Sequence, residues 1–354
     1  MDKLKGKITA FLLGMMMISM LSACSFGAQK RYESSFLELF DTASVIVGYA
    51  KNEEEFTEYS QMIYDELKLY NDLYDIYNDY EGINNIKTIN DNAGIKPVRV
   101  DRRIIDLLLF SRELYEKTDG EINVAFGSVL SLWHDHRSAG LDAPEKATLP
   151  DYEELKKRNQ HIDIDDMIID EEASTVYLKD PEMSLDVGAI AKGYAVERAA
   201  LFAQEAGFEN GMISVGGNVR TFGNKLDDNG KEIPWSVGIQ NPDLSSDEKT
   251  LYVLNLSGYS LVTSGIYERY YVVDGKQYHH IIDPKTLMPT EYFVSVSIIC
   301  PDSGMADALS TAVFNMPYEE GSKLIEGLDG AEALWVFPDQ SMKYSSGFQA
   351  MIKD

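Results

Sequence analysis

The amino-acid sequence predicts an α+β fold. Segments with helical and strand-like patterns alternate irregularly along the chain, without the regular strand–helix–strand order of a doubly wound sheet. The chain has 354 residues, of which 44% are hydrophobic, and this is enough for one large domain or two ordinary ones. Its 21 Tyr and 14 Phe residues supply a real core, which excludes global disorder.

The N-terminal segment has the pattern of an export signal. Lys3, Lys5 and Lys7 precede an apolar run over residues 8–21, and this run is shorter than the roughly 20 residues that span a membrane. A basic start followed by a short apolar run is typical of a secretory signal. The sequence is therefore divided into a signal peptide (1–23), a tether of polar and small residues (24–35) and one folded domain (36–354).

The signal ends in Leu21-Ser22-Ala23-Cys24, which resembles the lipobox of bacterial lipoproteins. The resemblance implies cleavage before Cys24, lipidation of the Cys24 thiol by groups such as palmitate, and display on the outer side of the cytoplasmic membrane. The alternative is an ordinary apolar helix with a buried cysteine. The other cysteine, Cys300, ends an apolar run and is predicted to be a small core residue, with a catalytic thiol as the alternative.

The charge balance limits the partners. With 58 Asp+Glu against 32 Lys+Arg, the formal net charge is −26. A protein that binds the phosphate backbone of nucleic acid needs a basic face, so we expect no nucleic-acid partner. A small anionic ligand remains possible, because backbone amides and a metal ion can bind phosphate inside an acidic protein.

Two amphipathic helices are expected in the first third of the chain, after a strand around residues 36–49. Between Glu54 and Tyr74, apolar residues recur at the three-to-four spacing of one helix face: Phe56, Tyr59, Ile63, Leu67 and Tyr70. A second helix is expected to begin after Asp101 as N-cap and to end near Gly120.

Further elements are predicted along the rest of the chain. Residues 134–170 are charged and contain proline, so we expect a surface insertion with a short helix after Pro150. The sequence then predicts a helix over 189–206 ended by Gly207, a hairpin of strands 270–273 and 278–282 around Asp274-Gly275, and helices over 305–314 and 318–328.

Two glycine-containing segments suit a bound ligand. In Leu185–Tyr194, Asp186 ends a strand and small residues begin a helix. Small residues allow close approach, and the first amides of a helix attract anions. A tight strand–helix turn explains the same pattern. In Val215–Arg220, Gly216-Gly217 permits either close ligand approach or a structural bulge.

Two further segments carry side chains suited to catalysis and metal binding. His279-His280 holds two of only five histidines, and histidine transfers protons near neutral pH; a structural role is the alternative. Asp307 and Thr311 are four residues apart, so they share a helix face. A carboxylate with a hydroxyl suits a hard cation such as Mg²⁺, although charge stabilisation at a helix N-terminus explains Asp307 equally well.

Together these motifs resemble those of the ApbE family of FAD:protein FMN transferases. They occur in order as Asp186…Lys192-Gly193-Tyr194, Val215-Gly216-Gly217-Asn218, His280-Ile281-Ile282-Asp283-Pro284-Lys285-Thr286 and Ala306-Asp307-Ala308-Leu309-Ser310-Thr311-Ala312. The resemblance runs from about Phe36 to the C-terminus. It implies an α+β fold of two related α/β halves with FAD bound between them.

The resemblance also implies a reaction and its residues. FMN would pass from FAD to a Thr or Ser hydroxyl of an acceptor protein in a membrane or extracytoplasmic electron-transfer system, with Mg²⁺ bound and AMP released. By position, Asp307, Thr311 and the backbone oxygen of Ala189 would bind the metal, Ser310 would assist, and His280 would be the candidate base. The positions that would line the FAD site are Phe40, Tyr77, Glu121, Ile122, Asn123, Asp186, Lys192 and Ile282.

The sequence departs from the family pattern at three places. The early Met-Gly-Thr of the family is Phe40-Asp41-Thr42 here, its Gly-x-Phe-Asp type of segment is Gly120-Glu121-Ile122-Asn123, and the glycine usual after Asp-Pro-x-Thr is Leu287. These changes concern the shape of the flavin pocket more than the metal site.

Two other functions fit the same motifs. An FAD pyrophosphatase would use water in place of the acceptor hydroxyl and give FMN and AMP. A non-enzymatic lipoprotein would bind FAD without releasing AMP.

Overall fold

The computed structural model describes residues 29–353. The predicted signal peptide and Cys24 lie outside these residues, so the export and lipidation predictions stay predictions. Within residues 29–353, no helix combines the length and the apolar character needed to cross a membrane.

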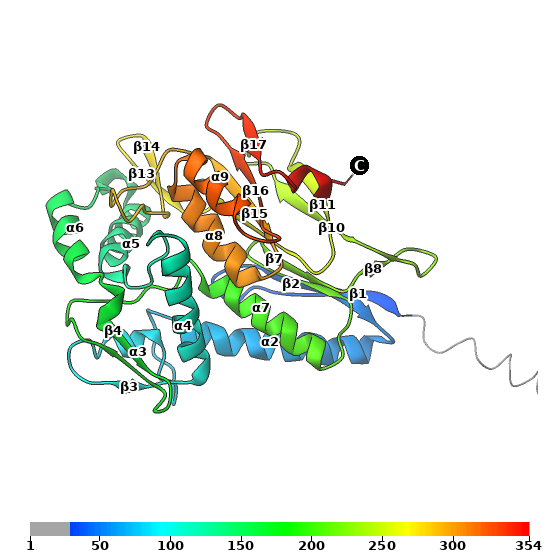
Figure 1. Ribbon diagram of the computed structural model, residues 1–354, viewed down its shortest axis with the longest axis horizontal. Coiled ribbons are helices and arrows are strands. Elements are labelled where there is room, and N and C mark those ends of the chain that lie inside the picture. Colours follow the sequence, from blue (N-terminus) through cyan, green and yellow to red (C-terminus); the bar gives the residue numbers. More distant parts are fainter. Residues whose placement is uncertain (1–28, 354) are drawn as a thin grey trace, which may run out of the picture.

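An eight-stranded antiparallel sheet organises the larger part of the molecule (Figure 1). Its strands lie in the order β1-β2-β6-β7-β12-β15-β16-β17, and each neighbouring pair is antiparallel. The strand bounds are Lys30–Phe36 (β1), Ser44–Ala50 (β2), Gly211–Val215 (β6), Asn218–Phe222 (β7), Ser260–Gly265 (β12), Ser295–Cys300 (β15), Glu332–Val336 (β16) and Met342–Tyr344 (β17). The antiparallel pairing confirms an α+β fold and excludes a doubly wound parallel sheet.

Helices cover one face of this sheet. They are α2 (Glu53–Tyr74), α7 (Ala191–Glu205), α8 (Ser303–Asn315) and α9 (Tyr318–Glu326). Figure 1 shows α2, α7 and α8 in front of the strands. Their apolar faces and the sheet share one large core, in which Ile63, Ala199 and Phe314 are fully buried. Burying a side chain of the size of Ile or Phe contributes about 1.5–3 kcal/mol, so this layer fixes the position of the helices.

A smaller core fills the opposite face. The antiparallel pair β10 (Trp235–Gln240) and β11 (Thr250–Leu256) packs Trp235 and Leu254 against sheet residues such as Ile299. Alternate residues of β10 are buried, which is the pattern of a strand with one face on a core. The short strands β8 (Lys225–Leu226) and β9 (Glu232–Ile233) and the 3₁₀ helix η4 (Phe348–Met351) complete this side.

A second lobe, mostly helical, lies beside the sheet (Figure 1). It contains a three-stranded sheet in the order β3-β5-β4 and the hairpin β13–β14. The bounds of its elements are Ile86–Asn90 (α3), Val98–Arg99 (β3), Arg102–Lys117 (α4), Gly127–Asp142 (α5), Pro144–Lys146 (η1), Tyr152–Arg158 (α6), Asn159–His161 (η2), Ile164–Asp166 (η3), Met167–Asp170 (β4), Thr175–Leu178 (β5), Tyr270–Val273 (β13) and Lys276–His279 (β14).

The predictions of local structure are confirmed where a cap or a clear periodicity supported them. The Asp101 side chain accepts a hydrogen bond from the amide of Arg103 and caps α4, and all but Tyr59 of the apolar residues predicted for α2 are buried. Asp274 and Gly275 both have positive φ angles, 48° and 78°, as a tight two-residue hairpin turn requires.

The predicted tether is wrong from Lys30 onward, because Lys30–Phe36 is strand β1. Tyr32 stacks on Phe56 of α2 with ring centroids 5.5 Å apart, and Phe36 meets Tyr64 edge-on at 5.0 Å. Alternate residues of this polar-looking segment therefore pack on α2. The folded domain begins at Lys30 rather than Phe36, and residues 37–43 form the loop before β2.

The predicted surface insertion over residues 134–170 is also wrong in its first part. Helix α5 continues through residues 134–142, and its Val129 and Trp133 are buried. The charged residues of its second half hid the helical pattern. The expected short helix after Pro150 is confirmed as α6.

Candidate active site in the cleft between the two lobes

A cleft of about 850 Å³ opens between the ends of the sheet strands and the second lobe. Its walls come from the loop before β2, the C-terminal end of α2, helix α5, the turn before α7, and the segment between β12 and β13. The structure brings these sequence-predicted residues together in its lining: Phe40, Tyr77, Glu121, Ile122, Asn123, Asp186, Ala189, Lys192, His280, Ile282, Asp307 and Thr311. Of the predicted site residues within 29–353, Ser310 alone is not part of the lining.

Asp307 is a buried residue of the cleft wall, at the junction of α7 and α8. One of its carboxylate oxygens, Oδ2, accepts a hydrogen bond from the Gly193 amide at 2.8 Å. Burial raises the pKa of Asp307, and the Lys192 ammonium, the Gly193 amide and the Asn218 side chain oppose that shift. A buried carboxylate is stabilised further by a cation beside it.

At the same junction, the backbone carbonyl oxygen of Ala189 lacks its usual helical hydrogen bond. In a regular helix the amide of Gly193 would donate to the carbonyl four residues earlier, which is that of Ala189. Because this amide donates to Asp307 instead, the Ala189 carbonyl receives no backbone hydrogen bond within residues 29–353. The Thr311 hydroxyl lies one helical turn after Asp307.

These three groups fit a small hard cation. A carboxylate, a carbonyl and a hydroxyl are oxygen donors of the kind that Mg²⁺ accepts, with water or phosphate completing its shell. Within residues 29–353, no group of three or more His, Cys, Asp and Glu side chains is arranged so that it could hold a metal ion.

The geometry does not support the predicted assistance of Ser310. Its hydroxyl is fully buried, donates to the Asp307 carbonyl at 2.8 Å and contacts the Ser264 hydroxyl at 2.8 Å. Ser310 is thus behind the cleft wall and links α8 to β12. Sequence position alone could not reveal this, because residues three and four positions after Asp307 both lie on the same side of the helix as Asp307.

The two adjacent histidines have different environments. His279 is buried, with Nε2 2.8 Å from the Thr290 carbonyl and Nδ1 accepting from the Ile281 amide. His280 lines the cleft, and its Nδ1 is 3.1 Å from the Arg269 carbonyl. A carbonyl only accepts, so Nδ1 carries the proton and Nε2 is left as an acceptor. Burial, with Arg269 and Arg137 nearby, lowers the pKa of His280 to about 3, so it is neutral at pH 7.

Tyr77 and Asp186 are connected through a histidine that sequence reasoning missed. The Tyr77 hydroxyl is 2.8 Å from Nδ1 of His134, and Nε2 of His134 is 3.7 Å from Oδ2 of Asp186. The other oxygen of Asp186 accepts from the Gly188 amide. Tyr77 remains 61% exposed at the cleft mouth, so its ring is available for stacking on a planar ligand.

The segment predicted to line the FAD site after Gly120 is fixed by its own side chains. Asn123 bonds the Ile162 carbonyl and the Ala125 amide. Glu121 pairs with Lys285 at 2.6 Å through Oε1, while its buried Oε2 has no partner among the described residues. Burial raises the pKa of Glu121. Ile282 supplies an apolar wall, and its carbonyl accepts from Asn315.

The departures from the family pattern keep the conformation that glycine favours. Asp41 and Leu287, which replace glycines of that pattern, have φ angles of +54° and +62°, and Phe40 also has a φ of +54°. Such angles are uncommon for non-glycine residues and are found at functional loops. The Phe40 amide is held by the Asn71 side chain at 2.9 Å. Phe40 and Asp41 line the cleft, whereas Leu287 is buried in the core of the second lobe.

Two other candidates from the sequence are structural. Cys300 is buried, and burial raises the pKa of its thiol to about 11, which leaves it protonated and unreactive. Arg220 forms a buried ion pair with Glu197, whose Oε2 also accepts from the Ser303 amide. This network joins β7, α7 and α8.

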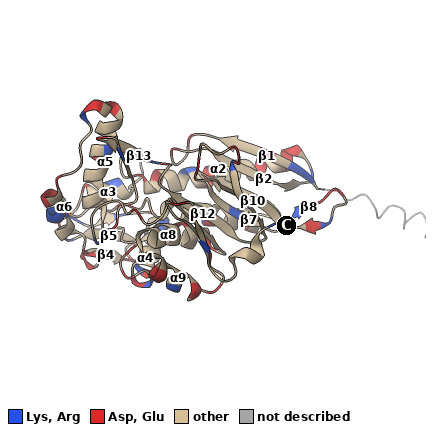
Figure 2. Ribbon diagram, turned by 90° about the horizontal axis from the view of Figure 1, so that it is seen from above, with Lys and Arg blue, Asp and Glu red and all other residues tan. Residues whose placement is uncertain are grey.

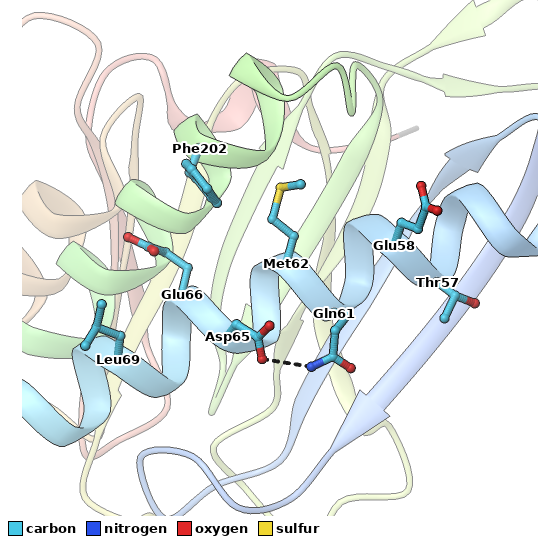
Figure 3. A pocket seen from close by; sticks show the side chains of 8 residues that line it. All are labelled: Thr57, Glu58, Gln61, Met62, Asp65, Glu66, Leu69 and Phe202. Atoms are coloured by element: carbon cyan, nitrogen blue, oxygen red, sulfur yellow. Dashed lines mark hydrogen bonds between the residues drawn. The ribbon is translucent and has the colours of Figure 1, made fainter. Parts of the chain in front are cut away.

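A second hollow lies on the outer surface of α2, and it lacks comparable chemistry. Figure 3 shows that seven of its eight lining side chains come from α2 and that Phe202 of α7 closes one side. Glu58, Asp65 and Glu66 lie in its lining, so it would repel an anionic ligand. Across the described residues, Figure 2 shows acidic and basic positions interspersed over the outer helices and loops.

A protein-family comparison covers the predicted site residues that line the cleft. The model of the ApbE family matches residues 40–335, which include all the cleft residues predicted from the sequence. This chain belongs to the ApbE family. The match also covers the four ordered motifs and the glycine-replacing positions Asp41 and Leu287.

Curated ApbE relatives are enzymes. A protein of Treponema pallidum named FAD:protein FMN transferase is 35% identical over 272 residues, covering 74% of this chain and 73% of that protein. A protein of Klebsiella pneumoniae with the same name is 31% identical over 266 residues, covering 74% and 77%. Assignment to ApbE is thus assignment to an enzyme family.

Solved ApbE structures share the fold. The ApbE protein of Thermotoga maritima superposes with a TM-score of 0.79 at 30% identity, covering 92% of this chain and 100% of that one. The flavin transferase ApbE of Vibrio cholerae gives a TM-score of 0.74 at 25% identity, covering 91% and 99%. The ApbE-like fold expected from the motifs is confirmed; the division into two related halves stays a prediction.

Proposed function

We propose that this chain is an FAD:protein FMN transferase, which moves FMN from FAD to a Thr or Ser hydroxyl of an acceptor protein and releases AMP, with Mg²⁺ bound. Membership of ApbE and the names of its relatives support flavin transfer to proteins. The observation that carries the proposal is one cleft with a neutral histidine, His280, and an oxygen-donor set around Asp307.

Mg²⁺ would be held by the Asp307 carboxylate, the Ala189 carbonyl and the Thr311 hydroxyl. It would supply positive charge to the pyrophosphate of FAD, whose charge the acidic chain would otherwise repel. The net charge of −26 makes this need greater.

The residues of the chain would perform the remaining work. The acceptor hydroxyl attacks the FMN phosphorus, a new P–O bond forms, and the bond from that phosphorus to the bridging oxygen breaks, so that AMP leaves. His280 Nε2 accepts the hydroxyl proton as a general base, which requires the neutral ring that its environment maintains. Tyr77, Phe40 and Ile282 would position the flavin nucleotide.

We also propose that the protein is exported and lipid-anchored through Cys24. The basic and apolar residues before Cys24 support this proposal. A single acyl chain binds membranes only marginally, so several chains on the modified cysteine would hold the protein. The acceptors would then be extracytoplasmic or membrane redox proteins.

The test uses the full chain in detergent with FAD, Mg²⁺ and a candidate acceptor protein. We expect covalent FMN on the acceptor by mass spectrometry and an equal amount of AMP, both abolished by EDTA. AMP released equally without acceptor would favour an FAD pyrophosphatase. FAD binding with no AMP release under the same conditions would favour a storage protein and contradict both enzymatic functions.

A further inference from the structure

Two arginines that no motif singled out meet in the cleft. Arg137 lies on α5, one helical turn after His134, and Arg269 lies just before β13. They come from distant parts of the chain, but each lowers the pKa of His280. The pKa of Arg137 is itself lowered, first by burial and then by the charge of Arg269. Both arginines line the same cleft as His280.

Rigid contacts hold this arrangement. The backbone amide and Nδ1 of His280 both contact the Arg269 carbonyl, at 3.0 and 3.1 Å. Helix α5 is pressed onto the hairpin, since a Cβ on Gly140 would lie only 2.7 Å from the ring of Tyr271. The Trp133 indole also donates to the Leu287 carbonyl at 3.1 Å. Arg137 and Arg269 are thus carried by packed elements.

Neither guanidinium is neutralised within the described residues. Arg102, Arg103 and Arg220 each pair with a carboxylate. Arg137 and Arg269 form no ion pair and donate no side-chain hydrogen bond to any residue of 29–353, although acidic residues greatly outnumber basic ones in this chain. The Asp186 carboxylate raises the pKa of Arg137 but forms an ion pair with neither arginine, and burial and Arg269 still lower that pKa. A bound anion would relieve the remaining repulsion between the two cations.

We propose that Arg137 and Arg269 together bind the pyrophosphate of FAD beside His280. The inference rests on the proposed function. If His280 takes the proton of the attacking hydroxyl, the phosphorus under attack must lie next to that hydroxyl, and hence in the part of the cleft where Arg137 and Arg269 act on His280. Guanidinium groups bind phosphate oxygens in a bidentate manner. Non-bridging oxygens of the pyrophosphate are their ligands, and both arginines are positioning residues that remain chemically unchanged.

The metal residues and the arginine pair would then share the charge of one ligand. Asp307, Ala189 and Thr311 belong to α8 and the turn before α7, whereas Arg137 and Arg269 belong to the second lobe. Pyrophosphate would thus bridge the two sides of the cleft. Riboflavin, which has no phosphate, would gain nothing from the arginines.

The experiment measures the binding of FAD and of riboflavin to the full chain by flavin fluorescence, once with EDTA and once with Mg²⁺. The proteins compared are the wild type, Arg137→Gln, Arg269→Gln and the double variant. Arg102→Gln, which removes an exposed arginine from α4, is the matched control. We expect FAD affinity to fall about tenfold for each substitution, as for loss of a hydrogen bond between charged groups, and riboflavin affinity to stay within about twofold.

The outcomes separate this proposal from the proposed function. FAD affinity and FMN transfer both unchanged in the double variant would overturn the arginine site while leaving flavin transfer intact. Equal losses for FAD and riboflavin would show a structural role and also overturn it. A selective loss for FAD supports the arginine site even if the wild type transfers no FMN, which would contradict the proposed function alone. Arg137→Lys and Arg269→Lys, which keep the charge, should recover part of the affinity if either glutamine variant folds poorly.

Discussion

The two sides of the cleft are built in different ways. On the sheet side, α7 and α8 meet through small residues and a buried carboxylate, and the backbone itself is part of the site. On the second-lobe side, His134, Arg137, Arg269 and His280 are side chains placed on a helix and a hairpin, with charges left uncompensated. Packing of small residues therefore specifies one wall, and long side chains specify the other.

The difference should be visible in mutants. Substitutions on the sheet side are expected to affect metal binding and stability together, because the same atoms serve both. Substitutions of the second-lobe side chains that line the cleft are expected to affect binding or rate with little change in stability at neutral pH.

The largest effect is expected for Asp307→Ala. Loss of the only carboxylate in the proposed metal set should reduce Mg²⁺-dependent turnover by about 10³-fold or more. The fold should persist, because burial raises the pKa of Asp307 and makes its charged form costly. Turnover and the Mg²⁺-induced rise in Tm are the measurements, with the exposed Asp65→Ala as control. Unchanged activity would remove Asp307 from the metal site.

The next effect separates the two histidines. His280→Ala should lower kcat about 10²-fold, the usual contribution of a general base, with a smaller change in FAD affinity. His279→Ala should instead lower Tm, because both ring nitrogens of His279 contact backbone groups in the core. Steady-state kinetics and thermal unfolding check both variants. If His280→Ala weakened FAD binding alone, His280 would be a wall of the pocket and not the base.

Gly193→Ala tests the packed side directly. A Cβ at this position would lie 2.3 Å from the Ser303 carbonyl oxygen and 2.4 Å from Cβ of Asp307. We expect destabilisation by about 1–3 kcal/mol, as for overpacking of a core, and weaker Mg²⁺ binding, measured by denaturant unfolding and by titration. At Gly327 the nearest contact of a Cβ is 3.4 Å, so Gly327→Ala should have a much smaller effect. Equal stability of both variants would contradict tight α7–α8 packing.

The smallest effect is a pH dependence of stability. The folded-state pKa of His280 is about 3 against an ordinary 6.5, so below pH 6.5 the unfolded state binds a proton that the folded state does not. The contribution of His280 to stability is therefore present above pH 6.5 and is lost as pH falls toward 3, by at most about 1.4 kcal/mol per pH unit.

Buried acids with raised pKa values, such as Glu121 and Asp307, act in the opposite direction, so a variant must isolate the histidine. His280→Asn removes the titrating ring. Thermal unfolding at pH 7.5 and 5.5 should show a larger loss of Tm in wild type than in this variant, by a few degrees. An identical loss in both would mean that His280 is protonated in the folded protein.

Much of the local structure could be predicted because it depends on neighbouring residues. Asp101 caps α4 by bonding an amide two residues away, and the apolar spacing of α2 needs only its own turns. Strand β1 could not be predicted in this way. Its polar segment becomes a strand because Tyr32 and Phe36 find aromatic partners on α2, and those contacts are long-range.

The residues of the candidate site also fall into those that the motifs predicted and those that only the structure showed. The motifs named Asp307, Ala189, Thr311 and His280, and the structure places all four in one cleft. They did not indicate that Ser310 is turned away, nor that His134, Arg137 and Arg269 belong to the cleft. A histidine and an arginine three residues apart share one face of a helix, which could have indicated a site. The segment was predicted to be a surface insertion, so its helix was not recognised.

The α+β class and the caps and faces of the main helices could be predicted from periodicity, capping and residue type, which act over a few residues. The family could be inferred from the resemblance of four motifs that occur in order along the chain. The tertiary structure was needed to show that Ser310 is fully buried and that His134, Arg137 and Arg269 line the cleft with His280. Those features depend on how α5, α7, α8 and the β13–β14 hairpin pack, and packing joins residues that the sequence keeps far apart.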